Sequence, residues 1–357
     1  MARLKALPWH EAASAAVASL IERGVHALLL HGQAGIGKLE LALDTAEALL
    51  CEQRAAKGLA CGHCAGCALV AAGTHPDLRI VRPAAMAEQE MERSVEGLAE
   101  AGGDSGSGAT APDPKARASR EIRIEQVRDL SEWASLTTHR GGARVIVLEP
   151  AESMTTPAAN ALLKILEEPP AATVFLVVSH RVSETLPTLR SRCVLVAVPA
   201  PSAAVAVPWL QARGVAEAQS RLIEAGGAPL LALQAEREGL TAELRDRLTG
   251  LLRKGARLTP AEVVASVPRE VPIAGAVALF QRWGWDFLAF KLAGVVRYHP
   301  KDVVAFRQLG TQWHAAEACE WLGELQTARA FADHPLNAKL AIEGMLLSYV
   351  RSIGTPQ

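Results

Sequence analysis

A glycine-rich loop near the start of the chain has the spacing of a phosphate-binding loop but lacks one of its chemical groups. Residues 32–38 read Gly-Gln-Ala-Gly-Ile-Gly-Lys, and Leu39 follows where a nucleotide hydrolase has Ser or Thr. In the complete motif, backbone N–H groups hold the phosphates, the Lys reaches the β and γ phosphates, and the hydroxyl ligates Mg²⁺. Leu39 has no oxygen to offer a metal. The spacing predicts a nucleotide site that is impaired for hydrolysis, formed by Gly32, Gly35, Gly37, Lys38 and Leu39.

The second half of such a site is expected after the apolar run 145–148, which ends in Glu149 and Pro150. A P-loop ATPase places an acidic Mg²⁺ partner here, followed by a catalytic Glu. Glu149 can serve the first role, but Pro150 has neither a carboxylate nor an N–H with which to activate water. Glu152 is a weak candidate for the missing base, because the proline redirects the chain. Hydrolysis should therefore be lost or extremely slow, while binding of ATP or ADP stays open.

Four cysteines follow the helix expected after this loop. Cys51, Cys61, Cys64 and Cys67 have the spacing C-x9-C-x2-C-x2-C, which suits tetrahedral Zn²⁺. Four thiolates leave no open coordination position, so we expect a structural zinc site. His63 and His75 are possible substitute ligands. The non-functional alternative is that the four thiols are clustered by chance. The other two cysteines, Cys193 and Cys319, are expected to be packed in the core.

Composition restricts the class of protein. The 357 residues suffice for two or three domains, and 37 Lys and Arg against 38 Asp and Glu give no global positive charge for autonomous nucleic-acid binding. No 18-residue uncharged apolar run and no signal-peptide core are found, which predicts a cytoplasmic protein without membrane spans. In that compartment six cysteines indicate metal ligands or free thiols rather than disulfides.

Apolar strand-like runs alternate with helical stretches over the first 199 residues, which predicts a parallel sheet with helices on both faces. Gly, Ser, Ala, Pro and Glu dominate residues 83–120, where we expect a mobile insert. The sequence predicts an α/β domain over 1–199, a small helical domain over 200–242 and a further helical domain over 243–357. The expected strands are 25–30, 78–81, 144–148, 173–179 and 194–198.

Three stretches resemble one family, the AAA+ clamp-loader subunits of bacterial DNA polymerase III. The first is the glycine-rich loop with its four cysteines, followed by Thr-His-Pro-Asp at 74–77. The second is 160–170, Asn-Ala-Leu-Leu-Lys-Ile-Leu-Glu-Glu-Pro-Pro, which is highly specific to clamp-loader ATPases. The third is 189–193, Leu-Arg-Ser-Arg-Cys, and His-Pro-Leu-Asn-Ala-Lys-Leu at 334–340 is a weaker match.

The resemblance implies an AAA+ P-loop domain with a zinc module, a small helical lid domain and a C-terminal helical collar domain. In this family the Ser-Arg-Cys segment supplies an arginine finger in trans, which assigns that role to Arg192. The alternative is that Arg192 only forms a surface salt bridge. Hydrolysing members also carry a sensor Arg in a Gly-Ser-x-Arg segment, and residues 226–230 contain no Arg. The resemblance therefore indicates a subunit that does not itself hydrolyse ATP.

The same resemblance implies partners. They are delta and gamma/tau clamp-loader subunits in a hetero-pentamer, and through it the sliding clamp and primed DNA. The assembly belongs to the DNA polymerase III holoenzyme, a nucleotidyltransferase. The C-terminal helices would hold the ring together, and their aromatic residues, among them Trp283, Trp285, Trp313 and Trp321, are expected to form a core.

Two alternatives remain open at this point. The chain could be an ATP-hydrolysing gamma-type motor subunit with unusual metal ligation, although a full tau-type subunit needs further C-terminal domains. It could also be a zinc-dependent DNA-binding module. The near-zero net charge argues against this alternative, and so does the cysteine cluster, which has only Arg54 and Lys57 close to it.

Overall fold

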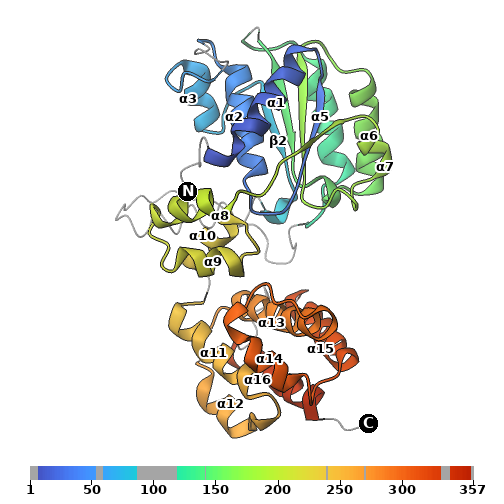
Figure 1. The fold of residues 1–357 in the computed structure, drawn as a ribbon. Coiled ribbons are helices and arrows are strands. Elements are labelled where there is room, and N and C mark those ends of the chain that lie inside the picture. Colours follow the sequence, from blue (N-terminus) through green and yellow to red (C-terminus); the bar gives the residue numbers. More distant parts are fainter. Residues whose placement is uncertain are drawn as a thin grey trace, which may run out of the picture. The chain divides into compact units, whose positions relative to one another are not determined.

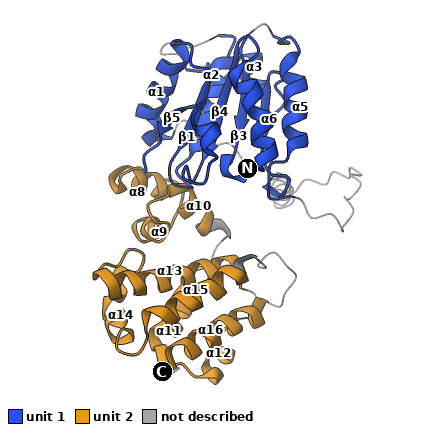
Figure 2. Ribbon diagram, turned by 90° about the vertical axis from the view of Figure 1, so that its right-hand side faces the viewer, with its two compact units in different colours: residues 1–200 blue, residues 201–357 orange. Residues whose placement is uncertain are grey.

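The computed structural model describes residues 7–53, 59–86, 119–140, 142–238, 240–268, 271–330 and 338–354. The chain divides into two compact units, Met1–Ala200 and Pro201–Gln357 (Figure 2). Most of the predicted insert 83–120 and residues 334–337 of the weaker family match lie outside the described residues. The domain boundary expected at residue 242 stays a prediction.

The first unit contains a five-stranded parallel sheet with the order β2-β3-β4-β1-β5 (Figure 1). The inner strands β3 and β4 are buried along their whole length, as expected for parallel strands covered on both faces. The edge strand β5 instead exposes Val194 and Leu195. The predicted strands are confirmed, with small shifts at β1 and β5; the bounds are β1 Ala27–His31, β2 Leu78–Val81, β3 Arg144–Leu148, β4 Thr173–Ser179 and β5 Val194–Ala197.

Helices cover both faces of this sheet. Successive strand residues point to opposite faces, and Leu29 and Phe175 pack with helices α5 and α6 on one of them. Helix α2 packs against β3 and β4 on the other face, where α1 lies against β5 (Figures 1 and 2). The helices of this unit are α1 Glu11–Glu22, α2 Lys38–Leu50, α3 Ala65–Ala71, α5 Ile124–Ser135, α6 Thr156–Glu167 and α7 Pro187–Arg190.

The described part of the second unit is helical, in agreement with the predicted fold class. Its core is largely aromatic, with Trp313 packed edge-on against Trp321 and Tyr349. Trp285 is an exception to the expected core, because 62% of it is exposed. The helices are α8 Ala203–Gln211, α9 Ala218–Glu224, α10 Pro229–Glu238, α11 Ala242–Lys254, α12 Pro260–Ser266, α13 Ile273–Ala293, α14 Val303–Leu309, α15 Ala315–Ala330 and α16 Ala338–Gly354.

None of the helices in the described ranges combines the length and the apolar character that crossing a membrane requires.

Candidate functional site

The glycine-rich loop joins the end of β1 to the start of α2, which is the position expected for a phosphate-binding loop. Gly37 caps α2 with φ 90°, a left-handed conformation that favours glycine. A Cβ atom on Gly32 would lie 2.4 Å from the carbonyl oxygen of Val198, so the loop passes too close to the backbone after β5 for any larger residue. Leu39 lies half-buried in the first turn of α2. The loop has the predicted position, and its backbone requires glycine at positions 32 and 37.

The amine of Lys38 is bound to its own loop. Its Nζ donates to the carbonyl oxygens of Gly32 at 2.8 Å and Gln33 at 2.5 Å, and the residue is 2% exposed. Burial lowers the pKa of Lys38 to about 8, against the raising effect of the Glu149 and Glu152 carboxylates. Two of the three N–H donors of the amine are therefore directed at carbonyl oxygens of its own loop.

The segment before α1 covers the same loop. Trp9 Nε1 donates to the carbonyl oxygen of Ile36 at 2.8 Å, and His10 Nε2 lies 2.9 Å from the same oxygen. Leu7 is buried, and its Cδ1 would lie 2.3 Å from a Cβ atom placed on Gly37. Burial lowers the pKa of His10, which favours the neutral ring. The sequence carried no signal for this contact, because it depends on a turn that brings distant polar groups together.

Glu149, the candidate Mg²⁺ partner, is 5% exposed and already paired. Arg82 donates to its Oε2 from Nε at 2.9 Å and from Nη2 at 2.6 Å. Burial, together with the positive charge of Lys38, lowers the pKa of His180 to about 4, so a neutral ring lies 3.6 Å from Glu149 Oε1. Sequence reasoning missed Arg82 altogether.

Glu152, the weak candidate for a catalytic base, also has a structural partner. Its two carboxylate oxygens accept from the backbone N–H of His180 at 3.0 and 3.3 Å. This contact anchors the loop that follows β4. Both acids near the glycine-rich loop are therefore engaged by protein groups.

Arg192 lies at the other end of the strands from this loop. In the register of β1 and β5, Leu28 pairs with Val194 and His31 with Ala197. Continued backwards, this register places Arg192 level with His26, where the strands begin, whereas the glycine-rich loop follows their finish. The two ends of a five-residue strand are roughly 15 Å apart. Arg192 and the nucleotide loop of the same chain are thus not brought together.

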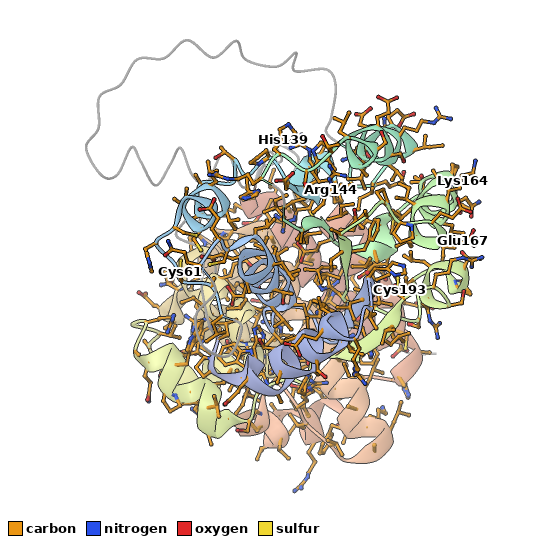
Figure 3. All side chains as sticks on the ribbon, turned by 90° about the horizontal axis from the view of Figure 1, so that it is seen from above. Cys61, His139, Arg144, Lys164, Glu167 and Cys193 are labelled. Atoms are coloured by element: carbon orange, nitrogen blue, oxygen red, sulfur yellow. The ribbon has the colours of Figure 1, made fainter. Side chains whose placement is uncertain are left out.

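The side chain of Arg192 is 36% exposed. It pairs with Glu167, and Nη1 donates to the carbonyl oxygen of Thr188 at 3.3 Å and to Ser191 Oγ at 3.4 Å. In Figure 3, Glu167 and Cys193 lie on the opposite side of the first unit from Cys61.

The four predicted cysteines form one cluster in which all Sγ atoms lie within 4.8 Å of one another. The Sγ atoms of Cys51 and Cys64 are 3.8 Å apart, and those of Cys61 and Cys67 are 3.9 Å apart. A tetrahedron with Zn–S bonds of about 2.3 Å has edges of about 3.8 Å. These four residues could hold a metal ion of this kind, and the donor set fits Zn²⁺.

Local structure explains how the cysteines converge. Cys51 ends α2 and Cys64 caps α3, where its Sγ accepts from the backbone N–H of Cys67 at 3.4 Å. A Cβ atom on Gly66 would lie 2.5 Å from the carbonyl oxygen of Leu50, so glycine lets α3 approach the end of α2.

The remaining histidine and cysteine predictions are corrected. The cluster of possible ligands contains no histidine among the residues described: His63 Nδ1 lies near the carbonyl oxygen of Cys61, and His75 Nδ1 accepts from Asp77 N–H. Cys193 is buried as expected, but Cys319 is exposed, because it lies on the outer face of α15.

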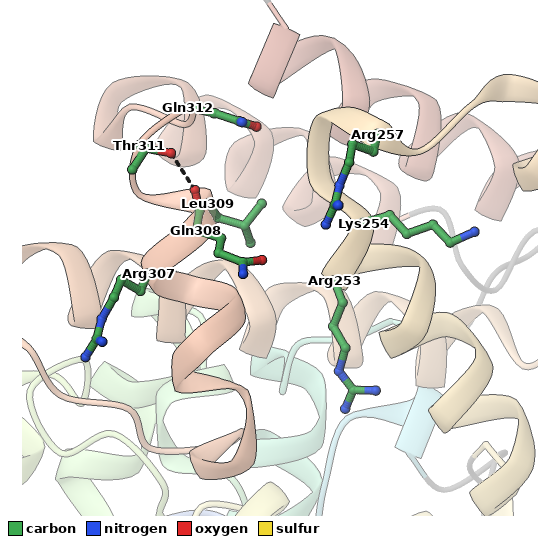
Figure 4. A pocket seen from close by; sticks show the side chains of 8 residues that line it. All are labelled: Arg253, Lys254, Arg257, Arg307, Gln308, Leu309, Thr311 and Gln312. Carbon is green, nitrogen blue, oxygen red and sulfur yellow. Dashed lines mark hydrogen bonds between the residues drawn. The ribbon is translucent and has the colours of Figure 1, made fainter.

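The second unit has an open hollow of about 460 Å³ with several basic side chains (Figure 4). Arg253 is paired with Asp302 and Lys254 with Glu262, each at 2.6 Å. Basic residues in the last turn of α11 and of α14 also offset the negative ends of these helices. We therefore assign no ligand to this hollow, whose lining is Arg253, Lys254, Arg257, Arg307, Gln308, Leu309, Thr311 and Gln312.

The parallel sheet order, the glycine-rich loop after β1 and the acidic residue after β3 define a P-loop protein with an AAA+-like clamp-loader fold. The chain belongs to the delta-prime subunit family of DNA polymerase III. A sequence profile described as "DNA polymerase III, delta subunit" matches residues 13–202, and the delta-prime subunit of Pseudomonas aeruginosa is 36% identical over 96% of each chain.

Two other proteins are also similar to this chain. The delta-prime subunit of Escherichia coli K12 is 34% identical over 203 residues, which cover 57% of this chain and 51% of that protein. Among solved structures, a gamma subunit-related protein of DNA polymerase III from Thermotoga maritima has a TM-score of 0.41 at 17% identity, covering 95% of this chain and 99% of the other.

Proposed function

We propose that this delta-prime subunit does not hydrolyse ATP and instead supplies Arg192 to ATP bound by a neighbouring subunit. The neighbour would be a gamma or tau motor subunit in a hetero-pentamer that also contains delta. The assembly would load the sliding clamp on primed DNA. A guanidinium that reaches the γ-phosphate stabilises transition-state charge and raises the rate of hydrolysis by about 10³ to 10⁵.

The position of Arg192 is the observation that carries this proposal. It lies where the strands begin, while the glycine-rich loop lies where they finish. Arg192 therefore cannot serve the nucleotide loop of its own chain without refolding the sheet. Its exposure, next to the exposed Val194 and Leu195 of β5, suits contact with a second subunit.

The nucleotide loop supports the non-hydrolysing part of the proposal. Leu39 cannot ligate Mg²⁺, and Arg82 neutralises the Glu149 carboxylate that would otherwise help to hold the metal. Lys38 is satisfied by Gly32 and Gln33 without a phosphate. We expect ATP and ADP to bind weakly or not at all. The gamma-type motor alternative would require all of these contacts to rearrange.

The cysteine cluster and the second unit would have structural roles. We propose that Cys51, Cys61, Cys64 and Cys67 hold Zn²⁺, which would fix the end of α2 against α3. The alternative of zinc-dependent DNA binding gains little support from the described residues near the cluster, because Arg140 is paired with Glu52 at 3.0 Å. Arg54 and Lys57 lie outside the described residues.

For the collar, Trp285 and Leu292 are seven residues apart on α13, and 62% and 75% of them are exposed. Residues at this spacing lie on the same side of a helix, so they form an apolar stripe. We propose that it packs against the helical domains of other subunits.

ATP hydrolysis tests the proposal. The chain alone should release no phosphate above background. Addition of delta, the motor subunits, sliding clamp and primed DNA should give turnover that falls when Arg192 is replaced by Ala. Robust turnover by the chain alone would replace this proposal with the motor alternative.

A further inference from the structure

We propose that Glu167 is a positioning residue that orients the guanidinium of Arg192 for the neighbouring active site. The inference rests on the proposed role of Arg192 in trans. It also gives a function to segment 160–170, the clamp-loader motif, which has no role in the nucleotide site described above. The contact joins the end of α6 to the segment between α7 and β5, so it links two family motifs in space.

The hydrogen bonds define how the guanidinium is held. Glu167 Oε1 accepts a hydrogen bond from Nε of Arg192 and forms an ion pair with Nη2, so both contacts lie along one edge of the planar group. Nη1 is turned toward the carbonyl oxygen of Thr188 and toward Ser191 Oγ. A guanidinium paired along one edge is restrained from rotating about its last side-chain bonds, which favours one direction before a phosphate arrives.

The same contacts leave the group able to donate. Arginine has five N–H donors, and Glu167 accepts from the one on Nε while Nη2 contacts the same carboxylate oxygen as an ion pair. The second N–H of Nη2 stays available, and the two contacts of Nη1 at 3.3 and 3.4 Å are long enough to be exchanged for phosphate oxygens. Glu167 therefore restrains the finger without consuming the end that would face the phosphate.

The support behind Glu167 is rigid although its carboxylate is 50% exposed. The preceding Leu166 is 2% exposed, and its carbonyl oxygen lies 3.0 Å from His26 Nε2 just before β1. Pro169 and Pro170 prevent continuation of the helix. Exposed ion pairs add little to folding stability, so a role of the Glu167–Arg192 pair in orienting the guanidinium explains the contact better than a role in stability.

A rival interpretation of the same contact predicts a change of the opposite sign in the rate of ATP hydrolysis. If Glu167 withheld Arg192 until assembly, its removal would speed hydrolysis by the neighbour. If it orients Arg192, its removal slows hydrolysis because the guanidinium samples unproductive directions. The sign of the change thus distinguishes positioning from withholding.

The test uses the reconstituted complex with clamp and primed DNA. Its motor subunits carry Ala in place of their own Ser-Arg-Cys arginines, so that the site facing this chain dominates turnover. Glu167→Ala should lower kcat for ATP by about three- to tenfold with KM changed less than twofold. Glu167→Gln keeps an acceptor oxygen and should recover at least half of the rate. Glu168→Ala is the matched control for loss of one carboxylate from the same motif and should match the parent.

A double variant separates this inference from the function on which it rests. Arg192→Ala combined with Glu167→Ala should be no slower than Arg192→Ala alone, because Glu167 acts only through Arg192. If Arg192→Ala has no effect, the proposed finger itself is wrong. If Arg192→Ala slows hydrolysis but Glu167→Ala leaves it unchanged or raises it, the finger stands and the positioning role of Glu167 is refuted.

Discussion

Arg82 contacts a single carboxylate oxygen of the buried Glu149 through two nitrogens: Nε donates a hydrogen bond at 2.9 Å, and Nη2 forms an ion pair at 2.6 Å. In a hydrolase this acid would face a bound metal. Here a protein cation already balances its charge. The proposed loss of hydrolysis would therefore depend on the Arg82–Glu149 pair as well as on Leu39.

Restoring the missing hydroxyl should not restore activity. Leu39→Thr returns the Mg²⁺ ligand, but Glu149 stays paired with Arg82, and Pro150 still offers no base. Phosphate release by the purified variant should equal that of the parent chain at saturating ATP and Mg²⁺. Turnover clearly above the parent would show that position 39 was the only obstacle.

Lys38 should matter for stability rather than for turnover. Lys38→Met removes the donor to the carbonyl oxygens of Gly32 and Gln33, which should lower the free energy of unfolding by about 1–2 kcal/mol. Denaturant unfolding measures this loss, with Lys254→Met on the exposed surface as control. At equal occupancy, ATP turnover of the assembled complex should change less than about twofold. A large fall in turnover would mean that Lys38 does contact a nucleotide.

Removal of the metal should destabilise the first unit. Cys64→Ser should reduce the bound zinc from one ion per chain to little or none, because three thiolates bind it less tightly than four. Metal analysis and thermal unfolding, before and after chelation, measure the effect. Cys319→Ser is the matched control, because Cys319 is exposed and outside the cluster. Equal zinc content in the two variants would exclude the proposed site.

Asp286 should make the second unit sensitive to acid. Burial alone would raise the pKa of Asp286, but hydrogen bonds from the His299 ring and from the backbone N–H groups of Tyr298 and Arg297 outweigh it and hold the pKa below its usual value. A carboxyl with a lowered pKa contributes stability above its unfolded pKa of about 3.9 and loses that contribution as pH falls through the folded pKa.

Asp286→Asn should therefore destabilise the protein by about 2–4 kcal/mol at pH 7, and this loss should shrink as the pH falls through the lowered folded pKa of Asp286. Urea unfolding at several pH values gives the comparison, with the exposed Asp246→Asn as control. A loss of stability that does not depend on pH would contradict the assignment to the charged carboxylate.

The sheet and the cysteine cluster could be predicted from the sequence for physical reasons. Parallel strands covered on both faces require continuous apolar runs. The runs Val145 to Leu148 and Val174 to Val178 have this character, and both are buried strands. Metal ligands require a donor type at close spacing, and four cysteines provide both. These requirements are local, so they can be seen without the fold.

The partners of the charged residues could not be predicted in this way. Arg82 and Glu149 are 67 residues apart, and Arg192 and Glu167 are 25 apart, without any periodic signal between them. Such pairs form because the strand order places their loops together, which the sequence does not state. The exposed Cys319 and Trp285 were predicted wrongly because residue type alone favoured burial.

The most direct test of the central claim is ATP turnover by the assembled complex, with clamp and primed DNA, when this subunit carries Arg192→Ala. Arg181→Ala, which removes an exposed arginine paired with Glu184, is the control. With the motor subunits' own fingers removed, we predict a loss of at least about 10³-fold at the site facing this chain, with assembly intact and the control unchanged. Turnover equal to that of the parent complex at full occupancy would contradict the account.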